Sequence, residues 1–318
     1  MGLNKSQDIL SSRTLIGIFW QAFHALVADQ TALLNRIAFP AESENASEKY
    51  GWLGQVPKMR EWIGARAAAK LVASDYEIKN KHFEATLEFL VKDLRRDKTN
   101  QIRARIGDLA STAGEHMYEL IVALMNAGAA TACYDGQEFY DTDHLEGDSG
   151  QQSNDLAVTA VDSAIPTQLE MAKIIKQMLE ALYGFKDEKG RAMNRGAKQF
   201  SLVVPVTYWG TALAAVSENI IEGAAGAAVS NPLGNLKGMI QVELETGLTA
   251  KTMHLLRTDA TMKPFIAQRE TDSMEIKAKA EGSEFAFDHD AHQYGVDAWH
   301  NAGYGLWQYA VLATVTDA

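Results

Sequence analysis

Two short clusters of aspartate and histidine are the side chains that come nearest to a metal site in this 318-residue chain. Their members are Asp141, Asp143 and His144 in the first cluster, and Asp288, His289, Asp290 and His292 in the second. Carboxylate and imidazole groups suit several divalent metals. Each cluster is nevertheless local, polar and turn-like, and aspartate is a favoured turn residue. We therefore expect turns without a metal, and a metal-dependent hydrolase is a distant alternative.

Other candidate chemistry is sparse. Cys133 is the one cysteine, which excludes an intramolecular disulfide and a cysteine zinc cluster, and we expect a buried or half-buried thiol. His116 lies beside Glu115 within a helical pattern, where a histidine with ordinary packing partners is expected. The sequence has no GxxxxGK[ST], HExxH or GxSxG motif, and no GxGxxG after a strand. We expect no catalytic residue, no cofactor and no bound metal.

Composition limits the class of protein. Lys plus Arg number 30 and Asp plus Glu 41, so the net charge is 30 − 41 = −11, which disfavours a general nucleic-acid binder. Hydrophobic residues make up 47%, too many for a disordered chain. No segment is a convincing membrane span. Leu15, Phe19, Phe23 and Leu26 recur at helical spacing and predict an amphipathic helix near the N-terminus.

Patterns within residues 36–127 predict extended elements that would not be stable by themselves. Residues 36–57 are punctuated by Pro and Gly and predict an extended arm. Residues 70–92 alternate with period two and predict a long β-hairpin. A two-stranded hairpin is marginal by itself, so we expect its apolar face to lie on a neighbouring subunit. Residues 98–127 predict a long helix, about 45 Å at 1.5 Å per residue.

The second half predicts a mixed α/β portion followed by strands. Helices are expected to end near Gly184 and to span 208–216, with strands at 200–206 and 239–244 and a Gly/Ala loop at 222–238. Further strands are expected at 253–256, 264–267, 274–278 and 304–314. The apolar stripe of the long helix should face these last strands, because such a stripe must be buried.

This order of arm, hairpin, long helix, α/β portion and returning strands resembles a viral capsid subunit of the Hong Kong 97 type. Several motifs are similar, more specifically, to the phage Mu-type major head subunit. They are YGWLGQVP at 50–57 with MREW at 59–62, YEIKN at 76–80, YDGQ at 134–137 with Phe139 and DTDH at 141–144, PFIAQR at 264–269, YGV at 294–296 and GYGLWQ at 303–308. The similarity extends from about residue 10 to residue 314.

The resemblance implies an α+β fold and a shell-forming function. It implies an N-terminal arm at 1–57, a hairpin (E-loop) at 58–97, a peripheral domain at 98–160 and 252–318 with its spine helix at 98–127, and an axial domain at 161–251. Copies would form pentamers and hexamers around packaged double-stranded DNA, without sequence-specific binding and without a membrane. A separate scaffolding protein, a head maturation protease and a portal would be partners. The subunit would be made in the host bacterial cytoplasm and reside in the virion.

Assembly contacts are then expected at aromatic anchors, at the apolar face of the hairpin and at a flexible glycine loop. The candidates are Tyr50, Trp52, Trp62, Tyr76, Phe83, Leu87, Phe89, Gly223 and Gly226. The loop at 222–238 is expected at the tip of the axial domain, since Gly permits several backbone conformations. A tail-tube or decoration subunit is the alternative, although the long helix argues against a tube.

Overall fold

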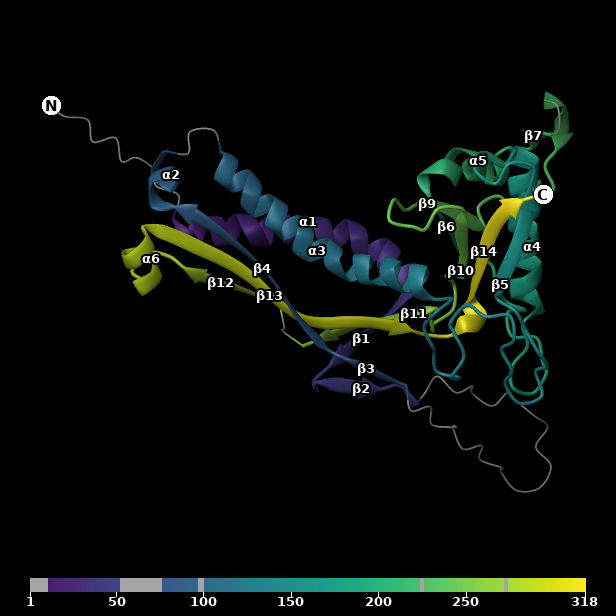
Figure 1. Cartoon of the computed structure of the whole chain (residues 1–318), viewed down its shortest axis with the longest axis horizontal. Helices are drawn as coiled ribbons and strands as arrows, with labels where there is room; N and C mark the ends of the chain where they lie inside the picture. Colours follow the sequence, from purple (N-terminus) through teal and green to yellow (C-terminus); the bar gives the residue numbers. More distant parts are fainter. Residues whose placement is uncertain (1–10, 52–75, 97–99, 224–225, 272–273) are drawn as a thin grey trace, which may run out of the picture.

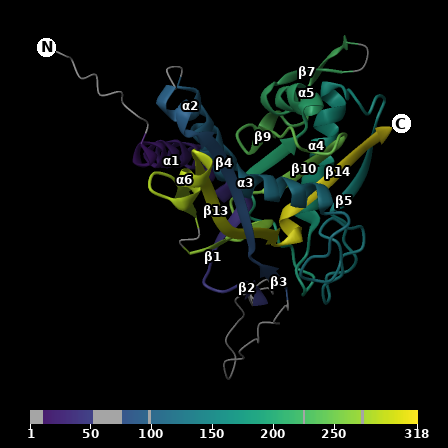
Figure 2. The same cartoon turned by 60° about the vertical axis from the view of Figure 1, so that its left-hand side comes forward.

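A long arm projects from a body of helices and strands in the computed structural model of this chain (Figure 1). The structure describes residues 11–51, 76–96, 100–223, 226–271 and 274–318. Helices α1 (Ser12–Ile37) and α3 (Gln101–Ala127) run along the arm. Helices α4 (Gln168–Gly184) and α5 (Val206–Ser217) lie on the body, and the turned view of Figure 2 shows the same separation.

The two long helices pack on each other through stripes set by their sequence. Leu15 and Phe19, four residues apart on α1, are fully buried, which confirms the predicted amphipathic helix. Ile102, Ile106 and Leu109 of α3 join them in one core. The helix predicted at 98–127 is also confirmed, and its apolar stripe explains why it lies against a second helix as well as a sheet.

A five-stranded sheet forms the other side of the arm. Its strands are β1 (Ala38–Ser43), β11 (Phe265–Glu270), β13 (Ala291–Tyr304), β12 (Glu275–Lys279) and β4 (Lys81–Leu90). The order is β1-β11-β13-β12, and β4 pairs with β13 over its whole length. Strand β1 runs parallel to β11, so the N-terminal segment predicted to be extended at 36–57 is anchored on the chain's own sheet.

The predicted hairpin at 70–92 is wrong where the structure describes it. Strand β3 (Glu77–Lys79) pairs with β2 (Ser47–Lys49), and β4 pairs with β13 from Leu90 opposite Ala291 to Lys81 opposite His300. Residues 70–75 lie outside the described chain. Alternation revealed the strand but carried no information about its partner, and β13 offers a longer ladder than residues 76–79 could.

A second five-stranded sheet forms the body. Its strands, in order, are β5 (Asp155–Ala160), β14 (Ala310–Asp317), β10 (Thr252–Arg257), β6 (Phe200–Val204) and β9 (Ile240–Leu244). Helices α4 and α5 pack on it and on each other. Strand β6 is buried at every position, as expected for a strand covered on both faces. The α/β portion predicted from Pro166 onward is therefore confirmed.

Two expectations for the C-terminal region need correction. The strand predicted at 304–314 is two strands, because the 3₁₀ turn η4 (Trp307–Tyr309) separates β13 from β14. The 14-residue β13 was missed, since its buried His292 and His300 obscure the apolar pattern. In addition, β10 pairs with β14 on one side and with β6 on the other. The boundary expected between the axial and peripheral domains at residue 251 would therefore divide one continuous sheet.

Three clusters of buried side chains hold the molecule together. The largest lies between the body sheet and the helices that pack on it. The second lies between α1, α3 and β13, and a small third lies around Tyr50 and Ile266. Helix α3 enters both larger cores, with Leu109 in the arm and Met117 in the body. Its stripe therefore meets the returning strands, as predicted, and also α1. Among the described helices, none is long and apolar enough to cross a membrane.

Candidate functional site

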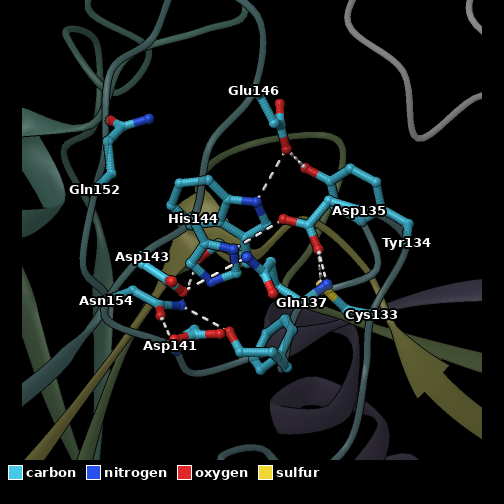
Figure 3. Close-up of polar contacts among 12 residues, drawn as sticks. Cys133, Tyr134, Asp135, Gln137, Asp141, Asp143, His144, Glu146, Gln152 and Asn154 are labelled. Carbon is cyan, nitrogen blue, oxygen red and sulfur yellow. Dashed lines mark hydrogen bonds and ion pairs between the residues drawn. The ribbon is translucent and has the colours of Figure 1, made fainter.

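The loop at 129–154, between α3 and β5, gathers the polar side chains that first suggested chemistry (Figure 3). His144 is fully buried, and its Nδ1 lies 2.8 Å from Asp135 Oδ2. The imidazole stacks on the Trp307 indole, with ring centroids 3.9 Å apart and planes 4° apart. Cys133 Sγ donates to the other oxygen of Asp135 at 3.0 Å. One carboxylate thus joins a thiol and an imidazole.

This arrangement does not activate the thiol. A nucleophilic cysteine needs a base that accepts its proton, usually an imidazole in direct contact. Here Asp135 lies between Cys133 and His144, and burial followed by the nearby carboxylate raises the pKa of Cys133 far above its usual value. Burial acts to raise the pKa of Asp135, but hydrogen bonds from His144 and Cys133 outweigh it and lower that pKa. The cysteine stays a thiol, as expected from the sequence.

A second, half-buried carboxylate fastens the loop to the η4 turn. Glu146 Oε1 accepts hydrogen bonds from Tyr134 Oη at 2.6 Å, Trp307 Nε1 at 3.0 Å and Gln308 Nε2 at 3.0 Å. Burial raises the pKa of Glu146, although these donors partly oppose it. Sequence reasoning missed Glu146, because a glutamate in a polar loop carries no sign that it accepts hydrogen bonds from three side chains.

Two buried asparagines complete the framework, and both were also missed. Asn154 Nδ2 donates to the Phe139 carbonyl at 2.8 Å, and its Oδ1 accepts from the Asp141 amide at 2.8 Å. Asn194 Nδ2 donates to the carbonyls of Leu182 and Gln308, both at 2.7 Å. These bonds satisfy a carbonyl in the last turn of α4, a carbonyl of the η4 turn and backbone groups of the loop, which would otherwise lack partners. The polar set therefore shapes the fold.

Neither cluster considered for metal binding forms a set of three converging ligands in the described part of the chain. In the first, His144 turns to Asp135, and Asp141 Oδ1 accepts from the Thr142 amide at 2.6 Å. In the second, His289 ends helix α6 (Glu284–His289), Asp290 has a left-handed backbone, and β13 begins directly afterwards. Within the described ranges, no three His, Cys, Asp or Glu side chains are arranged to hold a metal ion.

A histidine pair lies between α3 and the arm sheet. His116 Nδ1 is 2.7 Å from His300 Nε2, and the Phe83 ring packs against both imidazoles. Burial lowers the pKa of His116, and burial with the neighbouring His116 and Arg269 lowers the pKa of His300 to about 4. His116 thus has ordinary packing partners, as predicted, while the role of His300 was not foreseen.

Tyrosine anchors expected at subunit contacts bind within the same subunit. Tyr50 is buried, and its Oη donates to Gln268 Oε1 at 2.5 Å. Tyr76 Oη accepts from the Tyr304 amide at 2.8 Å. Tyr50 thereby fastens the segment after β2 to β11, and Tyr76 fastens the segment before β3 to β13. Trp52 and Trp62 lie outside the described residues.

The apolar face of β4 likewise packs on its own chain, where its side chains are half-buried. Leu87 and Phe89 pack against the arm core, and Phe83 packs against the histidine pair. The face therefore has partial cover within its own chain, and its contact with a neighbouring subunit stays a prediction.

The glycine candidates lie where a short ribbon turns. Strands β7 (Ile220–Glu222) and β8 (Ala228–Ser230) pair, so part of the predicted loop at 222–238 is a hairpin. Gly226 has φ of 76°, a conformation that favours glycine. A Cβ on Gly223 would lie 3.0 Å from Val229 Cγ1. The ribbon stands at the outer corner of the body in Figure 1, and its place in a shell stays a prediction.

Comparisons with known proteins agree with this architecture. The profile of the family described as Mu-like prophage major head subunit gpT matches residues 13–164 and 232–316. The Mu-like prophage FluMu major head subunit of Haemophilus influenzae is 35% identical over 143 residues, 45% of this chain and 46% of that protein. The major capsid protein of Escherichia phage Mu is 32% identical over 134 residues, 42% of this chain and 44% of that protein. These matches span less than half of either relative.

A solved structure is similar over most of the chain. A chain of the procapsid of bacteriophage JBD30 superposes with a TM-score of 0.51 at 26% identity, covering 94% of this chain and 75% of that one. The α+β architecture is thus the Hong Kong 97-type capsid fold that the sequence motifs implied. Because the family profile spans most of the sequence, the chain belongs to the family of Mu-like prophage major head subunits.

Proposed function

We propose that this chain is the major shell subunit of a phage head, assembling as pentamers and hexamers into an icosahedral capsid around double-stranded DNA. The observations that support the proposal are the family profile, which matches residues 13–164 and 232–316, and the likeness in fold to a procapsid subunit over 94% of this chain. The virion capsid is then its location. A scaffolding protein, a head maturation protease and a portal are the further partners proposed for assembly.

The chemistry of the polar loop supports a structural protein over an enzyme. The thiol of Cys133 is protonated and separated from His144 by Asp135, so it has no general base. Glu146 is engaged by three donors from Tyr134, Trp307 and Gln308. Asp135 and Glu146 are both engaged in holding the loop in place, as a structural role requires.

Electron microscopy of sedimented assemblies tests the proposal. Cells that produce this chain together with the other head proteins should yield closed shells containing it, and cells that lack only this chain should yield none. Averaged images should show capsomers with fivefold and sixfold neighbours. Tubes would favour the tail-tube alternative. Shells that form without this chain and acquire it afterwards would favour a decoration subunit.

A further inference from the structure

The histidine pair between α3 and the arm sheet depends on a hydrogen bond that tolerates one extra proton but not two. His116 Nδ1 lies 2.7 Å from His300 Nε2, so one imidazole donates to the other. A neutral imidazole has one donor and one acceptor nitrogen, whereas an imidazolium has two donors and no acceptor. If both rings were charged, two N–H groups would face each other and the bond would be lost.

The charges on the sheet around His300 disfavour a second proton. Arg269 of β11 and Lys81 of β4 each lie directly opposite His300, and directly opposite residues share a face of the sheet. Carboxylates lie within one turn of His116 on α3, at the adjoining pocket and opposite Arg269: these are Glu115 and Glu119, Glu84, and Glu42. Within the described chain, none of these carboxylates is hydrogen-bonded or ion-paired to either imidazole. A second proton would therefore lack a bonded counter-charge.

The pair lies where the arm core meets the body core. On α3, Leu109 belongs to the arm core, and Met117, the residue after His116, belongs to the body core. A pocket of about 120 Å³ adjoins both imidazoles, and its apolar wall includes Ala113 and Ala298. This volume holds several water molecules. A charged imidazole can therefore be hydrated here while both cores stay packed.

We propose that the His116–His300 pair is a proton-dependent latch between α3 and the arm sheet. The latch stays closed while the pair carries at most one extra proton. A second proton breaks the hydrogen bond, releases the Phe83 ring that packs on both imidazoles, and separates the helix from β4 and β13 at this place. The proposal concerns the conformation of one subunit and goes beyond the proposed function, on which it does not depend.

The pKa shifts of the two histidines set the pH range of the latch. Burial, then His116 and Arg269, lower the pKa of His300 to about 4. Burial also lowers the pKa of His116, and Glu119 opposes that effect in part. In the open latch the pKa of His300 returns to its ordinary 6.5, so the closed state is fully favoured above that pH and loses favour as the pH falls. Between pH 8 and pH 5, His300 alone raises the ratio of open to closed subunits by (1 + 10^1.5)/(1 + 10^−1), which is about 30-fold.

Thiol reactivity at the pocket measures this opening. Ala298 is buried, lines the pocket and lies opposite Phe83, so Ala298→Cys reports access to the latch. Thr207→Cys on the exposed side of α5 is the reference for the intrinsic rate at each pH. Dithiodipyridine is a suitable reagent, because it reacts with thiols in acidic as well as alkaline solution. The native Cys133 is buried and adds little background.

We expect the Ala298→Cys rate, divided by the Thr207→Cys rate, to rise about 30-fold or more from pH 8 to pH 5. Circular dichroism should show that the subunit is still folded at pH 5, because the opening is local. A rate ratio that does not change with pH would overturn the proposal, and so would loss of the folded signal at pH 5.

Further variants in the Ala298→Cys background assign the effect to the pair. His300→Gln cannot take up a proton, so its rate ratio should be nearly independent of pH. His254→Gln is the matched control, because it removes a histidine of the body whose pKa burial lowers to about 3, and it should keep the rise of about 30-fold. His300→Asn repeats the test if His300→Gln does not fold. A rise that persists in the variants of His300, or that disappears in His254→Gln, would refute the latch.

Discussion

Replacement of Gly305 by alanine is the sharpest test of how the arm joins the body. A Cβ at this position would lie 2.2 Å from the Lys263 carbonyl oxygen and 3.2 Å from the Pro264 carbonyl carbon. Ordinary contact begins at 3.4 Å, so the chain must move by 3.4 − 2.2 = 1.2 Å. The atoms in the way are backbone, so no side-chain rotation can relieve the overlap.

The displacement also threatens two hydrogen bonds. The Gly305 amide donates to the Pro264 carbonyl at 2.7 Å, and the Leu306 amide donates to the Lys263 carbonyl at 3.3 Å. Overpacking costs about 1–3 kcal/mol, and each lost hydrogen bond adds about 1 kcal/mol. We therefore expect Gly305→Ala to lower the free energy of unfolding by about 3 kcal/mol or more. The melting temperature should fall by roughly 6–12 °C, at about 2–4 °C per kcal/mol.

Urea unfolding and calorimetry of the purified subunit measure this effect. Gly107→Ala is the matched control, because a Cβ there meets nothing within 4 Å and the position is inside α3. It should stabilise the subunit by about 0.5–1 kcal/mol, the usual difference between Gly and Ala in a helix. If Gly305→Ala is as stable as wild type, close backbone approach is not the reason for this glycine.

Three further predictions concern the cores and buried groups. Leu109→Ala should lower the free energy of unfolding by about 2–5 kcal/mol and reduce soluble yield, because Leu109 is buried between α3 and its neighbours. Acidification should destabilise the subunit: burial lowers the pKa of His254 to about 3, and burial with His116 lowers that of His300 to about 4. Below their ordinary pKa of 6.5, both histidines take up a proton when the subunit unfolds. Their contribution to the free energy of unfolding is therefore complete above that pH and falls below it, by about 2 kcal/mol per histidine at pH 5. Equal urea midpoints at pH 8 and pH 5 would contradict this. Cys133 should resist alkylation at pH 8 until denaturant is added, and rapid labelling of the native subunit would show that its thiol is accessible.

The sequence was most informative where one element carries a complete periodic pattern. The stripe of Ile102, Ile106 and Leu109 located α3, and the alternation from Phe83 to Phe89 located β4. Both patterns report how an element is buried, and burial has the period of the element itself. The choice of partner is not local. Strand β4 pairs with a strand more than 190 residues away in the chain, and nothing within β4 distinguishes that partner from β3.

Buried polar residues were the other source of error. Asn154, Asn194 and Glu146 look like loop residues by type, yet they satisfy backbone and side-chain groups inside the molecule. The burial of the two asparagines and the hydrogen bonds of Glu146 follow from tertiary contacts that a single sequence does not encode in any spacing. The motifs containing Tyr134 and Trp307 were recognised by resemblance, and the structure supplies a physical reason for both: each side chain donates its own hydrogen bond to Glu146 Oε1.

Helix α3 and strand β13 together determine how the arm can respond to force. The helix has 27 residues and the strand 14, which correspond to about 40 Å and about 46 Å. They contact each other along the arm, and each continues unbroken toward the body (Figure 1). A hinge between arm and body would have to break hydrogen bonds in both at one place. We therefore expect the arm and the body to move together, with any bending spread along the length of the helix and the strand.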